Sequence, residues 1–178
     1  MLYKIAHILR DKLPWIWDLI GIINSFLFGL RYGSKMKNVQ NILSHFTKTT
    51  EEDGNVLSYK VEALDKCNLS LLVKMFAEQP ASAFNFFKPH GFDELSLKTL
   101  AKDKSFLAYI VVAEGTAQQK VCVGYFFQRS FFWGKSFRGY MTDYRWQRRG
   151  INKMMNLCAT EISSLLGLRV FGTIAPEN

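Results

Sequence analysis

The chain has 178 residues, which is enough for about one domain with a sizeable core, and 48% of them are hydrophobic and 21% charged. This composition argues against a disordered chain. The net charge of +8 at pH 7 favours an anionic partner and leaves open a nucleic acid, a membrane surface or a phosphorylated cofactor.

The first 46 residues form a segment of their own. Apolar residues recur at helical spacing between residues 5 and 30, and Pro14 marks a break or a first helical turn. Polar residues interrupt the run at Asp18, Asn24 and Ser25, so it is short and polar for a membrane span, and no cleavage site indicates a secretory signal.

Two alternatives remain open for this segment. Trp15 and Trp17, with basic residues on both flanks, suit a helix that lies in the interface of an anionic leaflet, so residues 1–40 are a candidate for peripheral membrane contact. The other alternative is a helix packed on the rest of the chain or on a second subunit of a homodimer. The flanking basic residues are Lys4, Arg10, Lys12, Arg31, Lys35 and Lys37.

The remaining pattern alternates strands and helices. The polar stretch 47–55 predicts a linker or turn, and residues 56–64 predict a strand. A helix capped by Asn68 and a short helix from Asp93 follow, and then strands over 106–114, 120–132 and 135–143. A helix from Ile151 that ends at Gly167 precedes a last strand over 168–174. This order predicts a mixed α+β fold.

The three cysteines are far apart and lack the C-x-x-C spacing of a zinc or redox site. They fit a reducing compartment, and we expect no metal. Cys122 falls in a strand-like run and Cys158 on the apolar side of a helix, so both are predicted to be buried structural thiols.

Three arginines, Arg145, Arg148 and Arg149, stand just ahead of the helix that begins at Ile151. The free N–H groups and the dipole of a helix N-terminus favour an anion there by about 0.3–1 kcal/mol, so cations in this place are locally unfavourable. Unless a carboxylate of the chain neutralises them, an external anion such as a phosphate compensates the charge.

The basic turn reads "QRRGIN" over 147–152, between a strand and an amphipathic helix. It resembles the Q/R-x-x-G-x-G/A pyrophosphate loop of the GNAT superfamily of acetyl-CoA-dependent N-acyltransferases, and the element order from Val56 to Ile174 also matches that family. The resemblance implies a mostly antiparallel mixed sheet flanked by helices over residues 56–178. Asn152 departs from the motif, because it replaces the usual last Gly or Ala and puts a larger side chain near the phosphates.

The resemblance also implies how acetyl-CoA is held. Its diphosphate would lie over the loop, with Gly150 allowing a close approach of the backbone. The strand before the loop would bind the pantetheine arm and polarise the thioester through a backbone amide. These implied contacts are Tyr140, Met141, Thr142, Gln147, Arg148, Arg149, Gly150, Ile151 and Asn152.

Asn178 resembles the start of the next family motif, where a helix brings a tyrosine that protonates the leaving thiolate. That helix and the last strands lie beyond the sequence, so we expect a domain truncated at its C-terminus, a fragment of a longer protein with poor activity alone. The alternatives are a form that another subunit completes and a degenerate relative of the family.

The catalytic candidates are His90, Asp143 and Tyr144. His90 lies in the segment "SAFNFFKPHGFDE", whose Phe84, Phe86, Phe87 and Phe92 would form an apolar wall of an acceptor pocket, and its imidazole is a candidate proton acceptor. The alternative is a loop that fills the core. Asp143 and Tyr144 would lie near the thioester, unless Asp143 pairs with an arginine and Tyr144 stacks on a neighbouring surface.

The resemblance therefore implies transfer of an acetyl group from acetyl-CoA to a primary amine, with an amino sugar or a surface-polysaccharide precursor as the acceptor. We expect a cytoplasmic protein, placed at the inner face of the membrane if the N-terminal helix binds there. The alternatives are a membrane-associated scaffold without activity and a phosphate-binding or nucleic-acid-binding module. Scattered rather than striped Lys and Arg residues count against nucleic acid.

Overall fold

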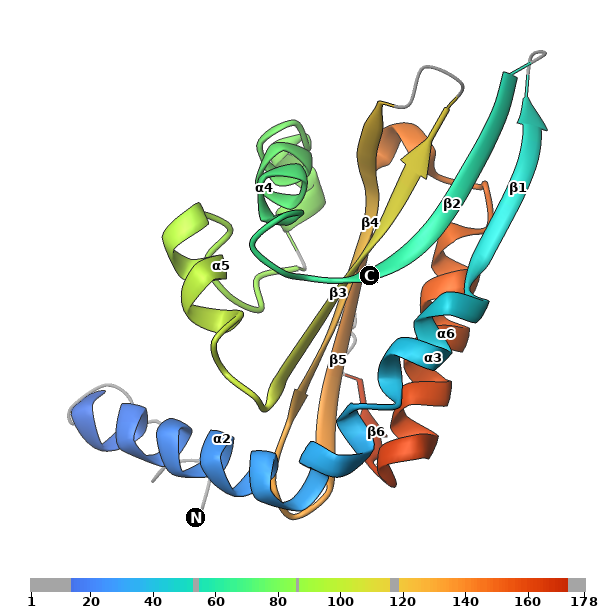
Figure 1. Ribbon diagram of the computed structural model, residues 1–178. Helices are drawn as coiled ribbons and strands as arrows, with labels where there is room; N and C mark the ends of the chain where they lie inside the picture. Colours follow the sequence, from blue (N-terminus) through green and yellow to red (C-terminus); the bar gives the residue numbers. More distant parts are fainter. Residues whose placement is uncertain (1–13, 53–54, 86, 116–118, 173–178) are drawn as a thin grey trace.

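The computed structural model describes residues 14–52, 55–85, 87–115 and 119–172, and Figure 1 shows how their elements are arranged. A six-stranded sheet with the order β1-β2-β3-β4-β5-β6 forms the centre. All neighbouring strands are antiparallel except β5 and β6, which are parallel. The strands are β1 (Thr47–Glu52), β2 (Asn55–Ala63), β3 (Phe106–Glu114), β4 (Lys120–Ser130), β5 (Lys135–Thr142) and β6 (Arg169–Phe171).

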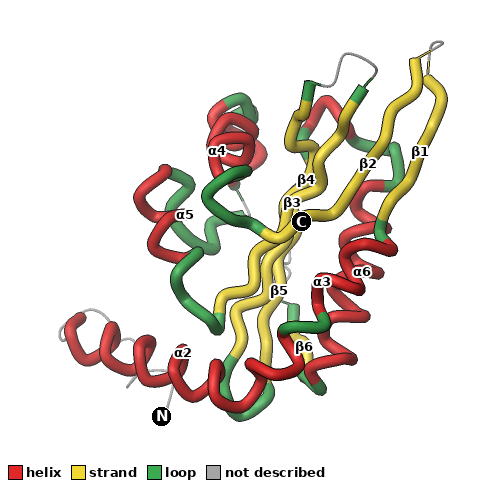
Figure 2. The backbone as a smooth tube through the Cα atoms, viewed as in Figure 1, coloured by secondary structure: helices red, strands yellow, loops and turns green. Residues whose placement is uncertain are grey.

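Helices cover both faces of the sheet, as Figures 1 and 2 show. The helices α4 and α5 lie on one face, and α3 and α6 lie on the other. The bounds are α2 (Pro14–Met36), α3 (Val39–His45), α4 (Leu69–Ala77), α5 (Glu94–Leu100) and α6 (Ile151–Leu166), with 3-10 turns η1 (Ala81–Phe84) and η2 (Tyr144–Trp146). The predicted mixed α+β class with a mostly antiparallel sheet is confirmed.

The core consists of two apolar clusters, one on each face of the sheet. The cluster under α6 also contains residues of α2 and α3, such as Phe28 and Leu43, so the N-terminal helices contribute to it. In this cluster α6 lies close to β4 at Gly124, where a Cβ atom would come within 2.8 Å of Ile151. The cluster under α4 and α5 is rich in aromatic rings. The thiols of Cys122 and Cys158 are buried, as predicted.

The prediction of a linker over 47–55 is wrong, because residues 47–52 form β1. This strand is at the edge of the sheet and pairs with β2 from Thr47↔Lys60 to Glu52↔Asn55. Its Thr, Lys and Glu residues look like a polar loop, yet charged residues are typical of an edge strand. The sequence Asp53-Gly54 between the two strands is a strong hairpin signal that the interpretation overlooked.

Two predicted helix caps have different outcomes. Gly167 ends α6 in the left-handed conformation, with φ of 69°, as predicted. Asn68 precedes α4, but its side chain makes no capping bond to that helix. Instead, the Asn68 amide group donates to the Ala63 carbonyl and its Oδ1 atom accepts from the Asp65 amide, so it closes the turn between β2 and α4.

The helix α2 begins at Pro14 within the described residues and projects sideways from the sheet (Figure 1). Asn24, one of the residues that interrupt its apolar run, exchanges hydrogen bonds of 3.0 Å with the Ser130 carbonyl and the Phe132 amide. Arg31 donates to the Phe132 carbonyl and Ser25 accepts from the Lys104 amide. These polar residues therefore attach α2 to the body of the protein.

The opposite side of α2 carries a stripe of large apolar residues that are 47–68% exposed. The spacing of i, i+4, i+7, i+8, i+11 and i+15 places them on one helix face. This exposed stripe consists of Trp15, Leu19, Ile22, Ile23, Phe26 and Leu30. No described helix is both long enough and apolar enough to cross a membrane.

Candidate functional site

The loop between β5 and α6 has an unusual backbone. Gly150 has a φ of 81°, and Arg148 has a φ of 63°, which makes it the one non-glycine residue with positive φ in the described part of the chain. Gly150 occupies the N-cap position of α6 without a side-chain cap, and the first turn of α6 holds no acidic residue. Left-handed residues that precede an uncapped helix present backbone N–H groups to a single point, which is the geometry of an anion-binding nest.

Cations surround this loop, and one of them comes from a distant part of the sequence. The Lys48 ammonium group on β1 donates to the Arg149 carbonyl at 3.2 Å. The Arg149 guanidinium lies 4.8 Å above the ring of Trp146, and Arg148 is exposed. The sequence contained no signal for Lys48, because its strand was interpreted as a linker.

Arg145 has carboxylate partners inside the chain. Its guanidinium contacts Asp143 at 2.7 Å and Glu78 at 2.6 Å. These hydrogen bonds raise the pKa of Arg145. The need for an external anion therefore does not concern Arg145, for which the alternative of pairing with Asp143 holds.

Asp143 is fully buried, and both of its carboxylate oxygens are engaged. Oδ1 accepts from the backbone N–H and Nε of Arg145, and Oδ2 accepts from its guanidinium. Burial raises the pKa of Asp143, but the hydrogen bonds from Arg145 outweigh it, so the pKa lies below its ordinary value. Asp143 therefore joins the end of β5 to η2 as an ionised carboxylate.

Tyr144 is half exposed, and its ring lies under the Arg145 guanidinium at 5.4 Å. Its backbone N–H donates to the side chain of Gln79, which is buried at the end of α4. The Tyr144 hydroxyl has no hydrogen-bond partner among the described residues. Gln79 and Glu78, which position η2 from α4, were not found from the sequence, because their partners are more than 60 residues away.

His90 lies on the other face of the sheet, in a group of aromatic rings. Its Nδ1 atom is 2.7 Å from the Gly91 carbonyl, which only accepts, so Nδ1 carries the proton. Nε2 then accepts from the Tyr125 hydroxyl at 2.8 Å. Burial lowers the pKa of His90. The surrounding rings belong to Phe76, Phe92, Phe106, Tyr125 and Phe127.

The predicted aromatic wall is packed rather than open. Phe84 and Phe87 both contact Phe92, and Phe87 also contacts Phe127 on β4. Gly139 on β5 accommodates this packing, since a Cβ atom there would come within 2.5 Å of the Phe127 ring. Phe86 lies outside the described residues.

The strand β5 has a free edge beside the loop. Its first residues, Lys135 to Phe137, pair with β6, whereas the described residues provide no strand partner on that side for 138–142. On the other side β5 pairs with β4 up to Gly124↔Thr142. Met141 is buried and Thr142 is partly buried on this half of the strand. The free edge ends where the loop begins, so the two form one continuous surface.

The remaining predicted loop residues differ in exposure. Gln147 and Asn152 are exposed, and Ile151, the first residue of α6, is buried. The Asn152 side chain accepts from the Asn156 amide group at 2.9 Å, so it is turned along the helix toward the following turn. Asn178 lies outside the described residues.

No protein-family model matches the sequence, and no curated protein matches it. Solved structures do resemble the fold. The GNAT domain of S. lividans PAT is 11% identical with a TM-score of 0.55, and the match covers 76% of this chain and 82% of that one. Spermidine N-acetyltransferase from Vibrio cholerae, in complex with CoA and spermine, is 16% identical with a TM-score of 0.52, over 67% of this chain and 73% of that one.

A third similar structure is AAC(6')-Iy in complex with the bisubstrate analog CoA-S-monomethyl-acetylneamine. It is 16% identical with a TM-score of 0.50, and the match covers 67% of this chain and 82% of that one. At these identities the likeness concerns the fold. The chain therefore has the GNAT fold, and the resemblance seen in the basic turn is confirmed at that level.

Proposed function

We propose that the protein is an acetyl-CoA-dependent N-acetyltransferase. The observation that carries this proposal is the left-handed backbone at Arg148 and Gly150, ahead of an uncapped helix and at the end of a strand with a free edge. A protein rarely keeps a non-glycine residue in this conformation without a reason, so the outlier points to function.

The described residues fit the parts of acetyl-CoA. The loop amides near Gly150 suit a diphosphate, with Lys48, Arg148 and Arg149 supplying positive charge around it. The free edge of 138–142 offers backbone groups to the amide-containing pantetheine arm. When bound, acetyl-CoA supplies an activated acetyl thioester. Met141 and Thr142 then contribute the backbone that polarises the thioester carbonyl.

In the reaction the amine nitrogen bonds to the acetyl carbon and the carbon–sulfur bond breaks; the amine gives up a proton to water, and the leaving sulfur takes one from a donor group of the chain. Among the three candidates, we assign the donor role to Tyr144, whose hydroxyl has no partner among the described residues and which directly precedes the basic loop. Asp143 holds η2 in place through Arg145. We assign His90 a structural role in the wall of the acceptor pocket, because its unprotonated Nε2 atom already accepts a hydrogen bond from the Tyr125 hydroxyl.

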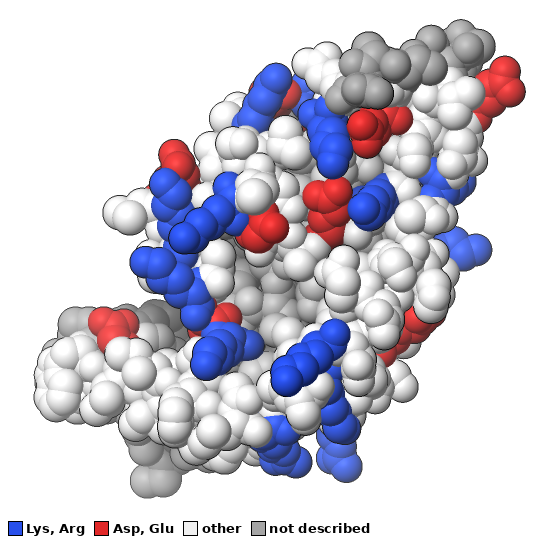
Figure 3. Space-filling view, viewed as in Figure 1, with Lys and Arg blue, Asp and Glu red and all other residues white. Residues whose placement is uncertain are grey.

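The proposed acceptor is a primary amine, and an amino sugar or a surface-polysaccharide precursor is the class we favour. The support is the similarity in fold to AAC(6')-Iy, which was solved with an acetylneamine-containing analog. Peripheral contact of α2 with an anionic membrane belongs to the same proposal. Its support is the exposed stripe together with the net charge of +8. Figure 3 shows α2 as a largely uncharged ridge, with Lys and Arg side chains gathered beside it.

The test is calorimetric titration of the full chain with CoA, and with pantetheine, which lacks the diphosphate. Gly150→Ala forces a side chain into a left-handed position and should weaken CoA binding at least tenfold, with pantetheine unaffected. Gly167→Ala is the matched control, since it introduces the same strain at the other end of α6, far from the loop. If both variants bind CoA alike, or if duplex DNA binds more tightly than CoA, the proposal fails.

A further inference from the structure

A cavity of about 370 Å³ lies at the opposite end of the sheet from the basic loop. Phe106, at the start of β3, pairs with Arg129, and Arg129 pairs with Phe137 at the start of β5. The loop instead follows Thr142, at the other end of β5. The cavity is therefore separate from the site proposed for acetyl-CoA.

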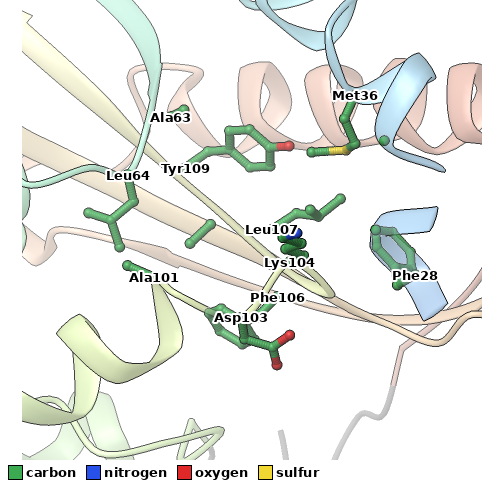
Figure 4. Close-up of a pocket in the computed structure, with 13 residues that line it drawn as sticks. Phe28, Met36, Ala63, Leu64, Ala101, Asp103, Lys104, Phe106, Leu107 and Tyr109 are labelled. Atoms are coloured by element: carbon green, nitrogen blue, oxygen red, sulfur yellow. The ribbon is translucent and has the colours of Figure 1, made fainter. Parts of the chain in front are cut away.

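The cavity lies between α2, the start of β3 and the segment after α5, and its walls are mostly apolar (Figure 4). Small residues create the space, notably Gly29 and Gly33 on α2. Its volume is within the range of roughly 300–1,000 Å³ that is usual for small-molecule sites. The larger apolar residues of the wall are Phe28, Met36, Leu64, Phe106 and Leu107.

The hydroxyl of a largely buried tyrosine, Tyr109, faces this cavity. Tyr109 is only 3% exposed and its ring stacks on Phe126, while its hydroxyl points across the cavity toward Met36 (Figure 4). No described residue exchanges a hydrogen bond with this hydroxyl. The hydroxyl opens onto the cavity, so water or the polar group of a ligand can form a hydrogen bond with it there.

The second polar group of the wall is a cation. The Lys104 side chain lies against Gly29, and its ammonium group has no carboxylate partner among the described residues. Asp103 also belongs to the wall, but its Oδ1 atom is held by the amide and hydroxyl groups of Ser105. The cavity thus combines an apolar interior, a tyrosine hydroxyl and, at its exposed side, an ammonium group that has no carboxylate partner among the described residues.

We propose that this cavity binds a single aliphatic chain with an anionic head group. The chain fills the apolar interior, and the carboxylate or phosphate head contacts Lys104 and accepts a hydrogen bond from Tyr109. The cavity is too small for a phospholipid with two chains. Gly33 lines the cavity and is seven residues from Phe26, so it lies on the same helix face as the exposed stripe. The stripe therefore offers an aliphatic ligand an apolar surface that leads to the cavity.

The test is calorimetric titration of the full chain with decanoate and with decyl phosphate, in buffer without vesicles. Gly33→Leu fills the cavity from α2, where a Cβ atom meets nothing within 4 Å. Gly21→Leu is the matched control, because Gly21 lies on the same helix, is equally unobstructed and does not line the cavity. Both changes favour the helix, so a loss of folding does not confuse the comparison.

We expect one decanoate or decyl phosphate per chain, at least a tenfold weaker binding in Gly33→Leu, and unchanged binding in Gly21→Leu. Tyr109→Phe and Lys104→Gln should each weaken binding several-fold, and decanol should bind more weakly than decanoate. Titration of the same variants with CoA distinguishes this site from the proposed active site, since Gly33→Leu should bind CoA normally. Equal binding in the two glycine variants, equal affinity for decanol, or no binding of either anion would overturn the proposal.

An additional measurement identifies the source of the ligand. Anionic vesicles that carry a fluorescent fatty acid are mixed with the protein, and transfer to the protein is compared with uptake of the same fatty acid from solution. Faster transfer from vesicles in the unmodified protein than in Gly33→Leu would support loading from a membrane. Uptake that proceeds equally in both proteins contradicts binding in the cavity.

Discussion

At the scale of single residues, the conformation of Arg148 opposes stability, and the proposed function assigns it a role in binding. A non-glycine residue in the left-handed region costs about 1 kcal/mol, and Arg148 has no ion pair among the described residues to offset it. The Lys48 ammonium group also lies at this loop, where it donates to the Arg149 carbonyl. This strain is consistent with the anion site proposed above.

The substitution Arg148→Gly separates these two effects. It should raise the free energy of unfolding by about 0.5–1 kcal/mol, because glycine adopts the left-handed conformation without strain. The affinity for CoA should fall several-fold, because a guanidinium group beside the diphosphate is lost. Urea unfolding and calorimetry measure the two quantities. An affinity equal to that of the unmodified protein would show that Arg148 does not contact the ligand.

His90 gives a prediction about pH. Burial lowers its pKa in the folded protein, so the unfolded chain takes up the proton more readily. The stabilisation from neutral His90 is therefore complete above the unfolded pKa of about 6.5, and it declines as the pH falls through that value toward the folded pKa. The loss cannot exceed about 1.4 kcal/mol per pH unit.

The measurement is urea unfolding at pH 7.5 and 5.5 for the unmodified protein and for His90→Gln, which keeps a polar side chain but does not titrate. The unmodified protein should lose more stability between the two pH values than the variant does. Equal losses in both proteins would mean that His90 is not the titrating group.

At the scale of secondary-structure elements, a small network fixes η2 between α4 and β5. Arg145 links Asp143, at the end of β5, to Glu78, which follows α4. Gln79 adds a hydrogen bond to the backbone of Tyr144. Since η2 leads directly into the basic loop, this network sets the direction in which the loop leaves the sheet.

Arg145→Met should lower the free energy of unfolding by roughly 2–3 kcal/mol, because it leaves the buried Asp143 carboxylate without its cation. Lys74→Met is the control, since Lys74 contacts the same Glu78 at 3.9 Å on the exposed side of α4 and should cost less than about 0.5 kcal/mol. Chemical denaturation gives both values. Similar losses in the two variants would argue against a structural role for the Asp143–Arg145 pair.

The elements could be predicted where local patterns were strong. Aromatic and β-branched residues identified β3, β4 and β5, and Gly167 identified the end of α6. Prediction failed where the same residue type is common in two different kinds of local structure. Threonines and glutamates in 47–52 form an edge strand, and Asn68 closes a turn rather than capping a helix. The pairing with β2 is what identifies 47–52 as a strand. The hydrogen bond to Ala63 is what identifies Asn68 as a turn residue.

The candidate site could likewise be predicted where its features are local in the sequence, and not where they depend on contacts between distant residues. The loop motif at 147–152 is local and was visible in the sequence, as was its position between a strand and a helix. Lys48, Glu78 and Gln79 reach the site from other elements, and their contacts depend on the sheet order. The packing of Phe87 against Gly139 also depends on this order, so the sequence could not show that the aromatic wall is filled.

At the scale of the whole molecule, the exposed stripe of α2 is an apolar surface that the described residues leave uncovered. Its residues are uncharged, and the polar side of the helix is bound to the turn after β4. Burial of such residues contributes about 25 cal/mol per Å², so the stripe favours association with an apolar surface.

Ile22→Glu, in the middle of the stripe, should reduce flotation of the protein with phosphatidylglycerol vesicles several-fold. Leu95→Glu is the control, because Leu95 is also highly exposed but lies on α5. Molar mass from light scattering is measured in parallel. A dimer that Ile22→Glu converts to a monomer, with no flotation of the unmodified protein, would contradict membrane contact and assign the stripe to a second copy.

The central claim is that the amides around Gly150 and the free edge of β5 hold CoA. Hydrogen–deuterium exchange of the full chain with and without CoA tests this most directly. We predict slower exchange over 148–153 and 138–142 when CoA is added, with no change in α5. CoA binding that leaves both segments unprotected, or protects only segments elsewhere, would contradict the account.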